Sequence, residues 1–125
     1  MSTVYFATNR NPNNASQPTD FGPEFAATNL GDLRFGHAQV VKGALDSSTI
    51  QVLPDNPQQG SGALFAQLRA NMQSQSLDTL VFIHGFNVSF KEAVESAAKI
   101  GESYAKLSSN RYYPNIFVFS WPSDG

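Results

Sequence analysis

The sequence predicts an α/β fold in which antiparallel strands near the N-terminus lead into a parallel strand–helix–strand unit. Two segments, Thr79–Ile83 and 115–121, are apolar on both faces, which is typical of strands in a parallel sheet that is covered on both sides. The long segment Phe90–Leu107 between them has the apolar spacing of an amphipathic helix. Together the three segments predict a right-handed βαβ crossover.

The N-terminal half supplies the expected antiparallel strands. Residues 3–7 are β-branched and aromatic and predict a short strand. Residues 32–42 and 49–53 predict two further strands, paired antiparallel and joined by the turn-forming residues 43–48. Residues 9–23 are rich in Asn and Pro and predict an extended loop.

Two helices are expected. Residues 63–74 place Leu64, Leu68 and Met72 on one helical stripe, with Ser61 as the predicted N-cap.

The second helix, Phe90–Leu107, is preceded by Ser89, and Glu92 follows three residues later, which is the pattern of a capping box. Its predicted apolar stripe consists of Phe90, Ala93, Val94, Ala97, Ile100, Tyr104 and Leu107.

Composition narrows the function classes. A chain of 125 residues predicts a single domain over residues 1–125. Its net charge of −2 and scattered Lys and Arg residues argue against nucleic acid as a partner. The absence of cysteine excludes disulfides and thiolate chemistry, and the distant His37 and His84 do not form the ligand pattern of a zinc site. We expect no metal and no cofactor.

The N-terminus lacks the basic and apolar regions of a signal peptide. No apolar stretch approaches the roughly 20 residues of a membrane helix. The sequence therefore predicts a soluble, cytoplasmic protein without a membrane partner.

The tetrapeptide His84-Gly85-Phe86-Asn87 marks the candidate site. It follows a predicted parallel strand and precedes a helix, where open α/β sheets bind ligands and helix N-termini offer unpaired N–H groups. Gly85 is expected to let the backbone turn here. One glycine without a following Gly-Lys excludes the dinucleotide and P-loop fingerprints. The expected ligand of this loop is an anion or an oxyanion.

Four segments carry a resemblance to a known family. They are VYFATNR at 4–10, LRFG at 33–36, VFIHGFNVSF at 81–90 and FSWPSDG at 119–125. In this order they resemble the bacterial esterase/lipase-like α/β-hydrolase family of unknown function. The resemblance implies hydrolysis of an ester or similar acyl substrate, with the Phe86 backbone N–H as one oxyanion donor. His84 and Gly85 would shape the loop, and Asn87 would hold its turn.

The catalytic triad of that family has no counterpart in the chain. There is no G-x-S-x-G elbow: Ser61 stands in a Gly-Ser-Gly of the wrong spacing, and Ser123 has Trp121 two positions before it. In α/β hydrolases the catalytic histidine follows the nucleophile and the acid, so His84 is interpreted as a turn residue rather than a base. Asp124 is interpreted as part of a loop.

The resemblance therefore covers the N-terminal half of the family fold, an incomplete α/β-hydrolase-like sheet. The chain alone is expected to be inactive, with no catalytic residue of its own and an ester or acyl substrate only in the complete protein.

Two alternatives remain open. One is a non-catalytic half-domain that binds a partner or self-associates through its exposed sheet. The other is a small anion-binding module that uses the helix N-terminus at residues 88–91. Because strand 115–121 is apolar on both faces, we expect either a homodimer or a complementing C-terminal chain to cover it.

Overall fold

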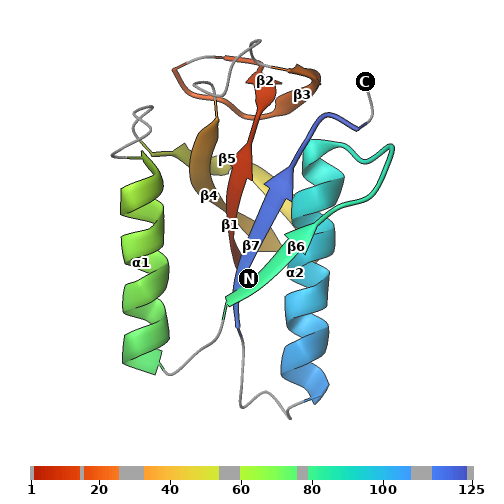
Figure 1. The fold of residues 1–125 in the computed structure, drawn as a ribbon. Coiled ribbons are helices and arrows are strands. Elements are labelled where there is room, and N and C mark those ends of the chain that lie inside the picture. Colours follow the sequence, from red (N-terminus) through yellow and green to blue (C-terminus); the bar gives the residue numbers. More distant parts are fainter. Residues whose placement is uncertain are drawn as a thin grey trace.

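The computed structural model describes residues 2–14, 16–25, 33–53, 60–75, 79–107 and 114–123. Seven strands and two helices occur in these ranges (Figure 1). In chain order they are β1 (Ser2–Thr8), β2 (Arg10–Pro12), β3 (Phe21–Phe25), β4 (Arg34–Val41), β5 (Ala44–Val52), α1 (Gly60–Gln75), β6 (Thr79–Ile83), α2 (Phe90–Leu107) and β7 (Asn115–Ser120).

The main sheet joins an antiparallel half to a parallel half. Its order is β5-β4-β1-β7-β6. The strands β5, β4 and β1 are neighbours with antiparallel pairing, whereas β1, β7 and β6 run parallel. Strand β7 pairs with β1 on one side and β6 on the other, so Val118 lies opposite both Phe6 and Phe82. This mixed sheet confirms the predicted α/β class and the parallel unit β6–α2–β7.

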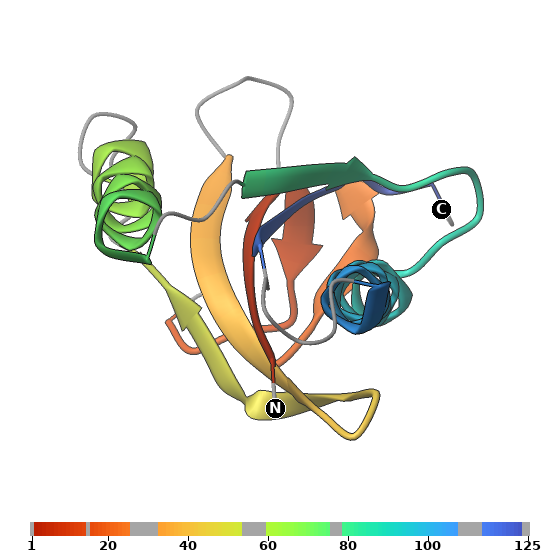
Figure 2. The same ribbon diagram turned by 90° about the horizontal axis from the view of Figure 1, so that it is seen from below.

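The two helices lie on opposite faces of the sheet (Figures 1 and 2). Helix α2 covers the larger core, in which Phe6, Phe21 and Phe90 form an aromatic cluster with ring centroids 4.7 to 5.7 Å apart. Helix α1 buries Leu64 and Leu68 against Tyr5 and its neighbours on the other face. Burying each side chain of this size stabilises the fold by about 1.5–3 kcal/mol.

Strand β6 is covered on one face only. Leu80 and Phe82 pack against the α2 core, but Val81 and Ile83 are 58% and 66% exposed. The prediction that this strand is buried on both faces is therefore wrong within the described residues. On this face α1 packs mainly against β4 and β7, and it meets β6 at the start of the strand, where Thr79 Oγ1 contacts Met72 Sδ at 3.2 Å.

The segment predicted as an extended loop, 9–23, contains β2 and the first residues of β3. Strands β2 and β3 pair antiparallel, with Arg10 opposite Phe25 and Pro12 opposite Phe21. Phe21 is buried in the α2 core. The loop prediction was wrong at both ends because one apolar anchor fixes a segment whose composition is otherwise that of a turn.

The β4–β5 connection is shorter than predicted. Lys42 and Gly43 form a two-residue turn with φ of 53° and 82°, and both values suit a hairpin turn that requires positive φ at each central residue. The predicted connector 43–48 is therefore mostly strand β5. Its polar residues occupy a register shift, where Asp46 Oδ1 accepts hydrogen bonds from the N–H and Oγ–H of Ser48.

The helix ends agree only in part with the sequence patterns. Helix α1 begins at Gly60, so Ser61 lies inside its first turn and is not the N-cap. The capping box of α2 is confirmed: the Ser89 N–H donates to Glu92 Oε1 and the Glu92 N–H donates to Ser89 Oγ, both at 3.1 Å. Within the described residues, no helix is both long and apolar enough to cross a membrane.

The buried stripe of α2 departs from the prediction in its second half. Ala98, Gly101 and Ala105 are buried, whereas Leu107 is 88% exposed and Tyr104 is exposed. Gly101 and Ala105 continue the helical repeat that begins with the buried residues of the first turns, so the small side chains face the sheet. The prediction placed the larger apolar residues on the buried face because they are more hydrophobic. The helix lies close to the sheet, so small residues occupy that face instead.

Candidate oxyanion loop

The candidate site lies where β6 ends, beside the end of β7 (Figure 1). Parallel pairing of Ile83 with Phe119 brings the loop 84–89 next to residues 120–123. The contacts of His84, Asn87 and Val88 with Trp121 and Ser123 arise from this neighbourhood.

His84 is a buried structural residue of this loop, only 4% exposed. The Trp121 backbone N–H donates to His84 Nε2 at 3.0 Å, so the proton of the imidazole is on Nδ1, which lies 2.8 Å from Gly85 O and donates to it. The Trp121 indole N–H donates to His84 O at 3.1 Å, and the two rings stack with centroids 5.5 Å apart. Both imidazole nitrogens are thus occupied by the backbone, and neither is available as a base.

Ser123 holds the other end of the loop. Its carbonyl accepts from the Asn87 N–H at 3.0 Å. Its hydroxyl accepts from the Val88 N–H at 3.0 Å and donates to Val88 O at 3.2 Å. Ser123, which its sequence spacing excludes as a nucleophile, is therefore a buried residue that holds the loop through hydrogen bonds.

The left-handed residue of the loop is Asn87, with φ of 60°. Asn adopts this conformation more readily than most residues. Gly85 has no positive φ, and a Cβ added to it would meet no atom within 4 Å. The expectation that Gly85 makes the turn is therefore wrong, because the strained backbone position falls two residues later.

Phe86 lies between these fixed groups and differs from them. Its side chain is 83% exposed. Within the described residues its backbone N–H makes no hydrogen bond, although the N–H groups of Asn87 and Val88 are both bonded. An N–H on a pinned loop without a protein acceptor can donate to a ligand. Asp124 lies outside the described residues.

Arg10 was not expected at the site. It is fully buried, and its guanidinium donates from Nε to Ser120 Oγ at 2.8 Å and from Nη1 to Gly22 O at 3.1 Å. Nη2 donates to Val88 O and, at 2.7 Å, to Trp121 O. Two signals in the sequence point to it: Arg10 follows the buried strand β1 by two residues, and it closes the VYFATNR segment at 4–10.

Comparison with protein families decides what the chain is similar to. A model described as "Alpha/beta hydrolase of unknown function (DUF900)" matches residues 61–125. The chain belongs to this α/β-hydrolase family. The match confirms the resemblance to an α/β-hydrolase family and covers α1 from its second residue, β6, the loop 84–89, α2 and β7. Searches of curated proteins and of solved structures gave no match.

Several donors at the helix N-terminus of this α/β-hydrolase family member are already bonded. The N–H groups of Val88, Ser89 and Glu92 are bonded to Ser123 Oγ, Glu92 Oε1 and Ser89 Oγ. The Glu92 carboxylate also occupies the position that an anion would take at the positive end of the helix. These contacts weigh against the predicted anion-binding module at residues 88–91.

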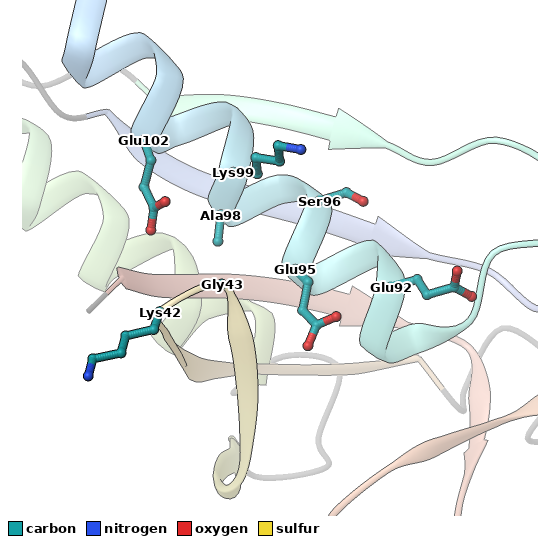
Figure 3. A pocket seen from close by; sticks show the side chains of 8 residues that line it. All are labelled: Lys42, Gly43, Glu92, Glu95, Ser96, Ala98, Lys99 and Glu102. Carbon is teal, nitrogen blue, oxygen red and sulfur yellow. The ribbon is translucent and has the colours of Figure 1, made fainter.

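A groove of about 540 Å³ lies apart from the loop, between the β4–β5 turn and α2 (Figure 3). Two of its carboxylates already fasten α2 to the sheet. Glu95 Oε2 accepts from the Leu45 N–H at 2.8 Å, and Glu102 Oε1 accepts from Ser2 Oγ at 3.0 Å. The groove is explained by helix packing and adds nothing to the site.

His37, the second histidine, lies in β4 and takes no part in the loop. Its ring packs edge-on against Tyr5 with centroids 6.0 Å apart. Burial lowers the pKa of His37 below its ordinary value of 6.5.

Proposed function

We propose that this chain supplies the oxyanion-hole loop of a serine hydrolase that cleaves an ester or related acyl substrate, with the Phe86 backbone N–H as one donor. The observation that carries the proposal is the Phe86 N–H itself, which has no acceptor within the described residues while the loop on either side of it is held by hydrogen bonds. The family match over residues 61–125 supports the same chemistry.

The chemical role follows from the charge that acyl transfer creates. When a nucleophile attacks a carbonyl, the oxygen becomes an oxyanion, and a donor already in place stabilises it without reorganisation. One such donor typically contributes about 3–4 kcal/mol to the transition state. The bonds of His84, Asn87 and Val88 fix the loop in advance, which is the condition for this effect.

The reactive groups come from outside these 125 residues in this proposal. The sequence has no G-x-S-x-G elbow, and α/β hydrolases take their second oxyanion donor from the residue after the nucleophile. Both ring nitrogens of His84 are occupied. The chain by itself is therefore expected to leave p-nitrophenyl esters intact.

The coding sequence beyond Gly125 gives the first test. We expect a G-x-S-x-G motif there, followed by an acid and a histidine. In the protein that carries this motif, Phe86→Pro removes the N–H and should lower kcat about 10²–10³-fold. Phe86→Leu keeps the N–H and changes only the exposed side chain, so it should retain activity. Equal kcat values for Phe86→Pro and Phe86→Leu would rule out the donor role.

A second candidate function is association through strand β6. Among the described strands it lies at one edge of the main sheet, and its exposed Val81 and Ile83 present apolar groups beside that edge. We propose that either a second copy or a complementing chain continues the sheet there. In sedimentation, Val81→Lys should abolish association, whereas Phe65→Lys on the exposed face of α1 should not. A wild-type chain that stays monomeric at high micromolar concentration and binds no hydrophobic dye would contradict the idea.

A further inference from the structure

The buried guanidinium of Arg10 contacts three segments around the candidate loop. Its acceptors are Gly22 O in β3, Ser120 Oγ at the end of β7, Trp121 O just beyond it and Val88 O just before α2. A buried cation is costly unless its donors are satisfied, and breaking such a set is strongly destabilising. Arg10 is thus a buried charged side chain whose hydrogen bonds go mostly to backbone carbonyls around the loop.

We propose that Arg10 is a positioning residue that holds the oxyanion loop in its working geometry. Through Val88 O it fixes the side of the loop that leads into α2. Through Trp121 O it fixes the residue whose backbone N–H and indole bind His84, on the other side of the loop. Phe86 lies between these two anchors. The catalytic consequence rests on the proposed function, but the positioning itself does not.

The number and spread of acceptors require arginine rather than lysine. Within the part of the chain that the structure describes, three nitrogens of one planar group reach at least four acceptors on three separate segments. The fork of guanidinium donors is rigid and wide, whereas a lysine ammonium presents all its donors from one atom. The backbone of Arg10 is held as well. Its N–H donates to Thr8 Oγ1, and the Thr8 hydroxyl donates to Ser120 O.

The test reads the loop directly by NMR. In the wild-type chain, ¹⁵N shifts of His84 should show one fixed tautomer with the proton on Nδ1. In Arg10→Lys and Arg10→Met this signature should move toward the average of both tautomers. The amide protons of Asn87 and Val88 should exchange about tenfold faster than in the wild type. The single tryptophan, Trp121, should change its fluorescence in the same variants.

Two controls separate positioning from a general loss of stability. Val40→Ala opens the buried core in β4 without touching the loop, and Arg69→Lys makes the same chemical change at an exposed arginine of α1. Neither should alter the His84 tautomer. If Val40→Ala moves the His84 and Trp121 signals as much as Arg10→Lys does, the proposal is overturned.

A measurement on the wild type covers the case in which the Arg10 variants do not fold. The Arg10 Nε–H should exchange with water far more slowly than the Arg69 Nε–H, and equal rates would overturn the proposal. In the complete enzyme, Arg10→Lys should lower kcat more than it raises KM. A loosened loop in Arg10→Lys together with an active Phe86→Pro would leave Arg10 as a positioning residue and refute only the oxyanion function.

Discussion

Replacing Gly36 by alanine should destabilise the chain, although the same replacement at Gly62 should stabilise it. A Cβ at Gly36 would collide with the Gln51 carbonyl oxygen of the neighbouring strand and lie 2.7 Å from Phe6 Cζ. Neither group can yield easily, because Gln51 O is backbone and the Phe6 ring packs against Phe21 and Phe90 at 5.7 and 5.1 Å.

The expected size of the effect follows from this geometry. Overpacking a core with one extra methyl typically costs about 1–3 kcal/mol, and a collision with backbone places Gly36→Ala at or above the upper end. At Gly62, in the first turn of α1, an added Cβ meets nothing within 4 Å. There alanine should contribute up to about 0.5–1 kcal/mol through its better helix propensity.

Urea unfolding followed by circular dichroism and Trp121 fluorescence measures both changes. We expect the midpoint to fall for Gly36→Ala and to rise slightly for Gly62→Ala, with the same m-value. A free energy of unfolding for Gly36→Ala within about 0.5 kcal/mol of the wild-type value would refute the steric argument. It would also leave the glycine of the LRFG segment without its packing role.

Two further predictions concern single side chains. Asn87→Val should cost about 1–2 kcal/mol because a β-branched residue is forced to positive φ, whereas Gly85→Ala should be nearly neutral; a reversed order in urea unfolding would contradict the assigned turn. Burial lowers the pKa of His37, so the unfolded chain binds its proton more readily, and stability should fall as the pH drops below about 6.5. His37→Gln should weaken this pH dependence, and identical unfolding midpoints for both proteins from about pH 7.5 to 5 would refute it.

The parallel unit was predictable because its signals are local. The run of apolar residues in β6, the capping box at Ser89 and Glu92, and the helical spacing of α2 each depend on residues close in sequence. The first half of strand β5 and the hairpin β2–β3 were missed because their polar residues have turn-like composition. Their pairing with β4 and the burial of Phe21 decide their structure.

The position of the loop could be predicted from the sequence, but its backbone conformation and hydrogen bonds could not. Its position between a strand and a helix N-terminus is visible in residues 81–90. Which residue takes positive φ, and which N–H remains without an acceptor, depends on Ser123 and Trp121, whose contacts come from the end of a different strand.

By itself the sequence determined the α/β class, the β6–α2–β7 unit and the position of a candidate oxyanion loop, because periodicity and capping act over a few residues. Only the tertiary structure decided the role of Arg10. Its acceptor Ser120 lies 110 positions away, and parallel pairing of β1 with β7 is what brings the two ends of the chain to one edge of the sheet. A buried arginine donates to the carbonyls that the fold places around it. Because these carbonyls are distant in the sequence, the residues next to Arg10 do not predict them.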